Sequence, residues 1–386
     1  MIEFNEPEVG RVKVRVVGVG NAGGMIVKRI AQERLSGVEC AAINTARKDL
    51  ESCLEIRSLQ IGEKVTRGHG AGMDPQVGRK AAQQDADKIR DFIGVNDVLF
   101  LVAGFGKGTG TGTTPVIAEL AREMGALTIA FVTHPFVVEG AQRQRVAEQG
   151  MKEIEGKVDT YMVLPNQKLL SVAPSPFSVA AGFAYMDEAV LAAIRGIVDV
   201  LLRPGRINLD LADLKTMLKN AGKGIFGIGA GKGGERVTEA VRGVREYPFL
   251  NEGHLRVARS LLVSISGGPD LGIHEIQDIT AEISKMVDGE PKIALGMNLD
   301  ESLQGELRIM VLAAGVGEPE IKAEEEYRLQ AEQDFGGRVP LYRSHVIAAK
   351  SVRPALPSLD FPAVADDTET PAYLRKGKGG TLGGRG

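Results

Sequence analysis

The sequence predicts an α/β protein with a parallel sheet, a long central helix, a second and smaller α/β domain, and a disordered C-terminal tail. Apolar runs typical of buried strands lead into glycine-rich turns that are followed by helical spacing, the order of elements in a parallel sheet. One stretch, residues 178–202, is apolar on nearly every helical face, as expected for a helix buried between two bodies. Sustained periodicity ends near residue 317, beyond which charge, proline and scattered apolar residues mix.

The composition excludes several classes of protein. The length of 386 residues fits two domains and a tail, and a 43% hydrophobic share is enough for two cores. Lysine and arginine (47) nearly balance aspartate and glutamate (50), so no basic surface for nucleic acid is expected. Cys40 and Cys53 are too few for a disulfide framework. Because no signal segment and no run of roughly 18 apolar residues occurs, we expect a soluble, cytoplasmic protein without a membrane span.

The first strand, Val12–Val17, runs into a glycine turn at Gly18–Gly24, and a helix is expected from Met25. The turn satisfies the dinucleotide fingerprint G-x-G-x-x-G, so a nicotinamide-dependent enzyme is one interpretation. The next strand, Glu39–Ile43, ends at Asn44–Ala46, where such an enzyme would place an acid for the ribose. The missing acid disfavours this alternative.

A strand at Val98–Val102 is followed by alternating glycine and threonine at Gly104–Thr114 and by helical spacing from Pro115. Alternating glycines allow successive backbone N–H groups to turn toward one point, where the positive end of the helix dipole also lies. This arrangement predicts phosphate binding, whereas a tight turn without a ligand explains shorter glycine runs better. The loop is not a Walker motif, because Gly108 follows Lys107.

The stretch 104–114 resembles the G-G-G-T-G-T-G loop of the tubulin/FtsZ superfamily of GTPases. Four further segments are similar to signatures of that family: residues 18–26 to G-V-G-G-A-G-G-N-A, 44–46 to N-T-D, 60–75 to a glycine-rich loop, and 134–143 to T-x-P-F-x-x-E-G-x-x-R. Asn21, Met25 and Ile26 depart from the first of these, Ala46 replaces an acid, and Lys107 replaces a glycine.

The resemblance implies binding of GTP and GDP, with Mg²⁺ held through the nucleotide phosphates and no metal site made by protein side chains. The residues implied to surround the phosphates are Gly20, Asn21, Ala22, Gly23, Gly24, Met25, Gly70, Ala71, Gly72, Gly106, Lys107, Gly108, Thr109, Gly110 and Thr111. It also implies that Glu139 binds the ribose and Arg143 the phosphates. Because these two residues are four apart, an ordinary solvent-exposed ion pair is the alternative.

The resemblance implies that the guanine base of the nucleotide is recognised at the end of the strand Thr160–Asn166 and on the central helix. Asn166 matches the family residue that meets the guanine edge. Phe183 and Asp187 are four apart, so an aromatic ring can stack on the purine while a carboxylate accepts hydrogen bonds from its N1–H and 2-amino groups. Adenine lacks that amino group, so a carboxylate here selects guanine. A core position is the alternative for Phe183.

Residues 206–214 follow the central helix and include Asn208, Asp210 and Asp213. Alone, the segment indicates a helix cap with acids in the first turn. It also matches the family's N-x-D-x-x-D synergy loop, which implies that these three catalytic residues enter the nucleotide site of the next subunit and position water there. A head-to-tail homopolymer, with hydrolysis completed between subunits, is therefore expected.

The predicted domains are residues 12–176 for GTP binding, 177–221 for the central helix and synergy loop, and 222–317 for a C-terminal GTPase-activating domain. Strands are expected in this last domain at 224–228, 261–266, 293–298 and 306–313, with a structural glycine turn at 229–234. A flexible linker, 318–366, and a tail, 367–386, would follow. Within the tail, Thr370–Lys376 resembles the family's terminal peptide, which implies binding of membrane tethers and division regulators.

The family comparison implies a filament-forming GTPase of the bacterial division ring, placed at the division site under the membrane. Two alternatives remain beside the nicotinamide enzyme. A purely structural polymer would need the synergy acids to be broken, and they are intact. A specialised paralogue that forms filaments outside division is harder to exclude, because Asn21, Met25 and Lys107 are unusual.

Overall fold

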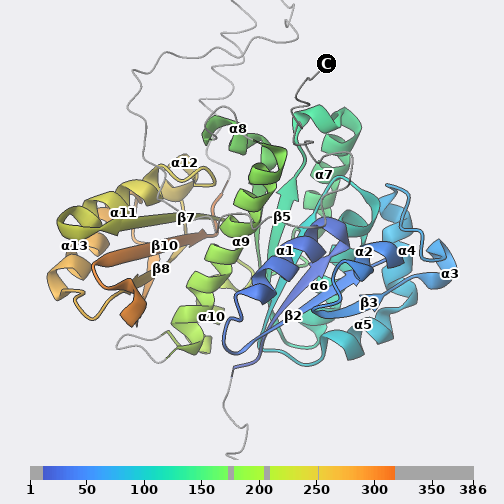
Figure 1. Cartoon of the computed structure of the whole chain (residues 1–386), viewed down its shortest axis with the longest axis horizontal. Helices are drawn as coiled ribbons and strands as arrows, with labels where there is room; N and C mark the ends of the chain where they lie inside the picture. The colour runs from blue at the N-terminus through green and yellow to red at the C-terminus, as the bar shows by residue number, and fades with distance from the viewer. Residues whose placement is uncertain (1–11, 173–177, 204–208, 251, 318–386) are drawn as a thin grey trace, which may run out of the picture. The chain divides into compact units, whose positions relative to one another are not determined.

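Ten strands form one sheet in the computed structural model, which describes residues 12–172, 178–203, 209–250 and 252–317 (Figure 1). The strand order is β3-β2-β1-β4-β5-β6-β7-β10-β8-β9. From β3 to β7 all neighbours are parallel, β10 is antiparallel to β7 and β8, and β8 is parallel to β9. The predicted α/β class with a largely parallel sheet is confirmed.

The elements of the first half, in chain order, are β1 Val14–Val19, α1 Gly20–Gln32, β2 Val38–Asn44, α2 Arg47–Glu51, β3 Arg57–Gln60, α3 Glu63–Thr66, α4 Pro75–Gln84, α5 Ala86–Ile93, β4 Val98–Gly104, α6 Gly108–Glu123, β5 Leu127–His134, α7 Ala141–Ile154, β6 Thr160–Pro165 and α8 Leu169–Val172. Those of the second half are α9 Val179–Leu202, α10 Leu211–Leu218, β7 Gly222–Lys232, α11 Arg236–Arg245, α12 Glu252–Arg256, β8 Ser260–Gly267, α13 Ile273–Ser284, β9 Lys292–Leu299 and β10 Glu306–Ala314.

Both faces of the first half of the sheet are covered, which explains why its strands are continuously apolar. On β4, Phe100 and Val102 belong to the core beneath α1 and α9, whereas Leu99 and Leu101 belong to the core beneath α4, α5, α6 and α7. The alternation follows from the two-residue period of a strand. All four side chains are fully buried.

The central helix α9 packs on α1 at one side and on β7, β8, β9 and β10 at the other (Figure 1). Ser178 caps its start by accepting a hydrogen bond from the Ala181 N–H at 3.1 Å. Val190 and Ile194 are fully buried in a core that also contains Val16 and Leu312, one from each half of the sheet. The prediction of a helix buried between two bodies is therefore confirmed.

Two helices begin earlier than the sequence pattern predicts. Helix α1 begins at Gly20 instead of Met25, and α6 begins at Gly108 instead of Pro115. The glycine and threonine residues expected in open loops thus form the first turns of these helices. Close packing explains the difference, because a Cβ on Gly110 would lie 2.4 Å from the Gly104 carbonyl oxygen, a contact that outweighs low helix propensity.

The second half also corrects one prediction. The residues expected to form a glycine turn, 229–234, instead continue β7 as far as Lys232. Alternate glycines on this strand bring its backbone against α11: a Cβ would lie 2.7 Å from the Val244 oxygen at Gly227, 1.8 Å from the Ala240 oxygen at Gly229 and 2.1 Å from the Arg236 oxygen at Gly231. The glycines therefore mark a strand that a helix approaches closely, because their period of two places them on one face.

The other strands of the second half are confirmed to within two residues by β8, β9 and β10. Strands β6 and β7 join the halves through a short pairing, from Thr160 beside Gly222 to Met162 beside Gly224. The division into domains at residue 222 stays a prediction. The predicted linker at 318–366 and tail at 367–386 lie outside the described residues, as does Asn208.

Replacing Gly229 with alanine should destabilise the protein by at least about 2 kcal/mol, because the new Cβ overlaps the Ala240 carbonyl oxygen of α11. Gly234→Ala is the matched control, since nothing lies within 4 Å of its Cβ position. Urea unfolding of both variants measures the difference. Equal midpoints for Gly229→Ala and Gly234→Ala would contradict the close approach of α11 to β7.

Candidate nucleotide site

Two glycine turns meet at the carboxyl ends of β1 and β4. These strands are parallel neighbours, with Val19 beside Ala103, so their ends lie at one edge of the sheet. A Cβ on Gly20 would lie 3.1 Å from the Gly110 nitrogen, and one on Gly104 would lie 2.8 Å from the Ala22 Cβ. Backbones this close tolerate only glycine, so the two turns form a single concave backbone surface.

The predicted third segment, Gly70–Gly72, lies against the same surface. A Cβ on Gly108 would lie 2.7 Å from the Ala71 Cβ. Two contacts to the end of β2 support this placement: His69 forms an isolated bridge with Ala46, and the hydroxyls of Thr45 and Thr109 are hydrogen-bonded at 2.6 Å. The structure thus brings the three glycine segments together, as the sequence predicts.

Three of the longer helices begin at this edge without a side-chain cap. The residues before α1, α6 and α7 are Val19, Lys107 and Gly140, and none of them caps its helix with a side-chain hydrogen bond. Helix α7 belongs to the group because a Cβ on Gly106 would lie 3.0 Å from the Arg143 oxygen. The first N–H groups of these helices have no intrahelical acceptor, so they offer donors and positive dipole ends to phosphate oxygens.

Three of the departures from the family pattern fall on exposed positions of this surface, whereas Ile26 is buried and Ala46 is partly buried. Asn21, Met25 and Lys107 are all exposed. Lys107 adopts an extended backbone, φ −123°, which any residue can occupy, whereas Gly106 has φ +104°. The lysine therefore replaces a glycine without backbone strain. Met25 also contacts the Ser52 hydroxyl, with 3.8 Å between Sδ and Oγ.

Glu139 and Arg143 form the ion pair that their spacing allows. The other carboxylate oxygen of Glu139 accepts a hydrogen bond from the Phe136 N–H at 2.9 Å. Both side chains are partly buried, so the pair is more restrained than a fully exposed one. Their predicted contacts with ribose and phosphate stay predictions.

The predicted base-reading residues lie at the end of β6 and on α9. Asn166 is buried directly after β6, and the Phe183 ring is 50% exposed. Phe183 meets Phe136 edge to face, with ring centroids 6.2 Å apart, which leaves part of its ring surface open for stacking. Burial raises the pKa of Asp187 to about 6, while the nearby Arg29 lowers it and Glu188 raises it. Asp187 therefore becomes ionised just below neutral pH.

Asp210 and Asp213 lie away from the glycine turns. They stand at the start of α10, whose end lies beside Thr160, the first residue of β6, so α10 approaches the opposite edge of the sheet. Asp210 caps α10 by accepting a hydrogen bond from the Asp213 N–H at 2.7 Å. Both side chains are exposed. The capping interpretation is confirmed, and the acids remain accessible to another molecule.

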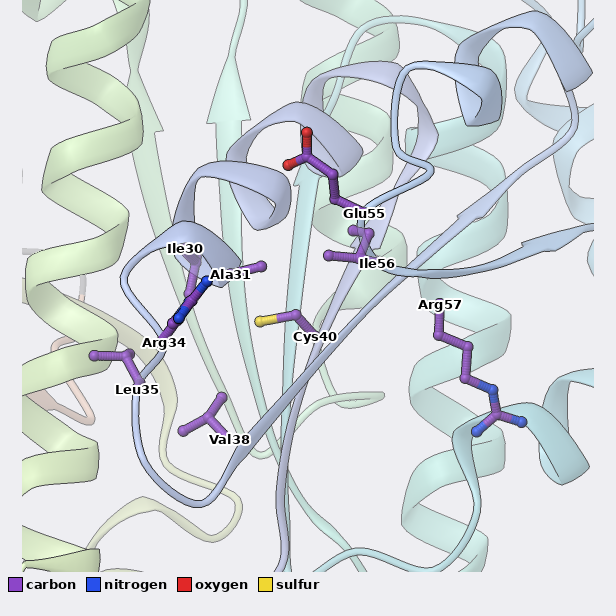
Figure 2. A pocket seen from close by; sticks show the side chains of 9 residues that line it. All are labelled: Ile30, Ala31, Arg34, Leu35, Val38, Cys40, Glu55, Ile56 and Arg57. Carbon is purple, nitrogen blue, oxygen red and sulfur yellow. The ribbon is translucent and has the colours of Figure 1, made fainter.

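A cavity of about 230 Å³ lies at the other end of β2, lined by Ile30, Ala31, Arg34, Leu35, Val38, Cys40, Glu55, Ile56 and Arg57. Figure 2 shows the Cys40 side chain among these residues. Val38 begins β2, whereas the glycine turns follow the last residues of the strands, so this cavity is separate from the candidate site. Burial raises the pKa of Cys40 to about 11, which keeps the thiol protonated at neutral pH.

Within the described ranges, no group of three or more histidine, cysteine, aspartate or glutamate side chains could hold a metal ion. Nor is any helix in the described part of the chain both long and apolar enough to cross a membrane. The sequence reasoning did not include Thr45 and Phe136 among the site residues. Neither had a strong signal, because each acts through one contact with a residue distant in sequence, Thr109 and Phe183 respectively.

Known proteins match this chain over both halves of the sheet. Residues 13–174 match the GTPase domain of the tubulin/FtsZ family, and residues 222–317 match the C-terminal domain of the FtsZ family. The cell division protein FtsZ of Pseudomonas aeruginosa is 38% identical over 304 residues, covering 79% of this chain and 77% of that protein. The FtsZ of Coxiella burnetii is 37% identical over 317 residues, 82% of each chain.

Solved structures give the same result. An empty FtsZ dimer from M. jannaschii has a TM-score of 0.75 and 35% identity, covering 80% of this chain and 90% of that one. A protofilament of CetZ2 from Haloferax volcanii with GTPγS bound has a TM-score of 0.69 and 23% identity, covering 85% of this chain and 100% of that one. At this identity the similarity is one of fold. The fold and the site define a nucleotide-binding protein. The chain belongs to the tubulin/FtsZ family and is an FtsZ-like GTPase.

The pKa of Asp187 predicts how GTP binding depends on pH. If Asp187 reads guanine as the family resemblance implies, only its carboxylate form can accept both hydrogen bonds, so GTP affinity should be constant above pH 7 and fall by up to about tenfold per unit below pH 6, as Asp187 becomes protonated. Asp187→Asn should bind GTP weakly at every pH. Competition binding from pH 5.5 to 8 measures both proteins.

Glu188→Gln is the control for this experiment. It should keep the pH dependence with its midpoint moved to lower pH, because Glu188 raises the pKa of Asp187. Asp187→Ala should weaken GTP binding, since a lost hydrogen bond to a charged group costs about 1.5–3 kcal/mol, and leave any weak ATP binding unchanged. Equal losses for GTP and ATP would show that Asp187 does not read guanine.

Proposed function

We propose that this chain polymerises head to tail and hydrolyses GTP at the junctions between its subunits. One observation carries the nucleotide part of the proposal: three helix starts without side-chain caps converge with three glycine segments at one edge of the sheet. Such a surface binds a chain of phosphates through backbone N–H groups. Met25, Asn21 and Ala22 form its rim, and Lys107 adds a positive charge.

The remaining predicted site residues complete the pocket in this proposal. Glu139 contacts the ribose, Arg143 the phosphates, and Asn166, Phe183 and Asp187 the guanine. Mg²⁺ would be held through the nucleotide phosphates, as the family resemblance implies.

Hydrolysis requires a group that orients water. The acids beside the glycine surface already have partners, because Asp74 caps α4 and Glu139 pairs with Arg143. The exposed carboxylates of Asp210 and Asp213, at the start of α10, lie toward the opposite edge of the sheet. In a head-to-tail polymer the opposite ends of successive subunits meet, so these acids would face the γ-phosphate of a neighbour. Asn208 would join them.

We further propose a role in bacterial cell division, in the cytoplasm under the membrane, on the basis of the FtsZ relatives. Residues Thr370–Lys376 would capture membrane tethers and division regulators. A specialised paralogue that forms filaments outside division is the second candidate, favoured by the unusual Asn21, Met25 and Lys107. Depletion of the protein in its own cells separates the two, because only the first predicts failure of septation.

A complementation experiment tests the shared site. Asp213→Ala should bind GTP normally and assemble, yet turn over GTP slowly. Asp187→Ala should also turn over GTP slowly when the GTP concentration is high enough to fill intact pockets but too low to fill its impaired ones. Mixed in equal amounts, the two proteins should recover about a quarter of the wild-type rate, because random head-to-tail mixing places an intact pocket against intact acids at about that share of junctions.

The control is a mixture of Asp210→Ala with Asp213→Ala. Both defects lie on the acid side, so no junction becomes complete and turnover stays low. Light scattering and pelleting show whether Asp213→Ala and Asp187→Ala copolymerise. If they copolymerised without regaining turnover, the proposal of a shared site would be wrong, and the acids would only cap α10.

A further inference from the structure

The end of α10 is tied to the GTP-binding half of the chain by buried polar contacts. The Thr160 hydroxyl donates a hydrogen bond to the Leu218 carbonyl oxygen at 2.7 Å. Two residues later, the Asn220 N–H donates to the Asp159 carboxylate at 3.3 Å, and the Gly222 N–H donates to the Asp159 carbonyl at 2.8 Å. The chain between α10 and β7 is therefore fixed to the start of β6.

Asp159 is the centre of these contacts. It is 3% exposed, and its second carboxylate oxygen accepts hydrogen bonds from the N–H and hydroxyl of Thr128, at 2.8 and 3.0 Å. A buried carboxylate needs a positive partner as well as hydrogen bonds. Arg122 supplies the charge, with 3.8 Å between its Nε and the Asp159 Oδ1.

Arg122 also holds Asn220 directly. Its Nη2 donates to the Asn220 Oδ1 at 2.7 Å, and its Nη1 donates to the Gly156 carbonyl. Asn220 has φ +54°, a left-handed conformation that asparagine tolerates better than most residues. The turn after α10 thus depends on a side-chain contact with Arg122 and on an unusual backbone conformation at the same residue.

Arg122 lies in the last turn of α6, the helix whose first turn begins at Gly108 in the glycine surface. The acids Asp210 and Asp213 lie at the first turn of α10, whose end Arg122 helps to fix. Helix α10 has 8 residues and is a rigid connection between its two ends. A change in the position of Asn220 is therefore transmitted to the acids.

We propose that Arg122, through Asn220 and Asp159, is a positioning residue that sets where Asp210 and Asp213 stand in the neighbouring subunit's GTP site. The inference rests on the proposed function, in which these acids act in the next subunit. Arg122 touches neither the nucleotide surface nor the acids. Its effect should therefore appear in turnover at the neighbour's site and not in GTP binding at its own.

Arg122→Ala should keep GTP affinity within twofold and lower turnover on the order of tenfold, because small misplacements of a catalytic group have effects of this size. Arg90→Ala is the matched control, because Arg90 pairs with Glu123, beside Arg122 in the sequence, and with Asp87, both of which lie outside the turn after α10. It should change neither quantity. Comparable turnover in Arg122→Ala and Arg90→Ala would overturn the inference.

Substitutions at Asn220 test the same contact from the other side. Asn220→Gly keeps the left-handed backbone but removes the acceptor for Arg122, so it should reproduce the loss of turnover. Asn220→Asp keeps an acceptor and should retain turnover. The double variant Arg122→Ala/Asn220→Gly should be no slower than the slower single variant, because both remove one interaction. Additive losses would contradict it. If Arg122→Ala fails to fold, Asn220→Gly carries the test alone.

Mixing Arg122→Ala with other variants shows on which side of the subunit junction its defect lies. Arg122→Ala should regain turnover when it is mixed with Asp187→Ala, because that protein has an impaired pocket but intact acids. It should not regain turnover with Asp213→Ala, because the acids of that protein are impaired as well. Recovery with Asp213→Ala instead would mean that Arg122 acts through α6 on its own pocket, and the inference would fail. Failure of the proposed function gives a different result, because Asp213→Ala and Asp187→Ala would then not complement each other either.

Discussion

Backbone contact without side chains is the constraint on which the candidate site depends. At the edge where β1 and β4 end, the chain approaches itself so closely that a Cβ on Gly23 would lie 2.1 Å from the Val102 carbonyl oxygen, and one on Gly112 would lie 1.9 Å from the Pro75 oxygen. The first contact brings α1 against β4, and the second brings α6 against α4. Glycine is required because any larger residue would separate elements that must meet.

The same principle operates where no ligand is expected. Gly227, Gly229 and Gly231 allow α11 to lie directly on β7, and Gly296 allows α9 to approach β9, where a Cβ would lie 2.0 Å from the Val200 Cγ1. Glycine clusters in this chain therefore have two uses, which are distinguished by their place in the fold. The first kind lies at helix starts without side-chain caps, and the second lies within strands that a helix covers.

Much of the fold could be predicted from the sequence, because the parallel strands are continuously apolar and the central helix has a long uninterrupted pattern. The helix starts could not, because Gly108–Thr114 has low helix propensity and is helical only through its packing partners. The sequence also predicts a turn at 229–234, whereas β7 continues to Lys232. The glycines of this strand face α11, and no local sequence pattern reveals a helix that is distant in the chain.

The candidate site divides in a similar way. The glycine segments after β1 and β4 could be predicted from their place between strand and helix patterns, and Gly70–Gly72 from the family resemblance. The structure brings all three together. Contacts between single residues far apart in sequence could not be predicted. Examples are the contacts of Thr45 with Thr109 and of Phe136 with Phe183. Arg122 gives no sequence signal at all, because its partners Asp159 and Asn220 follow it by 37 and 98 residues, which the fold alone brings within reach.

The exposure of Asn21, Met25 and Lys107 has an evolutionary consequence. All three lie on the rim of a surface whose floor is glycine backbone, and their side chains are exposed. Substitution at the rim changes charge and polarity without moving the floor, whereas substitution at Gly23 or Gly112 displaces two elements at once. Sequence change should therefore be tolerated at Asn21, Met25 and Lys107 more readily than at Gly23 or Gly112, because rim side chains can differ while the backbone geometry of the floor stays the same.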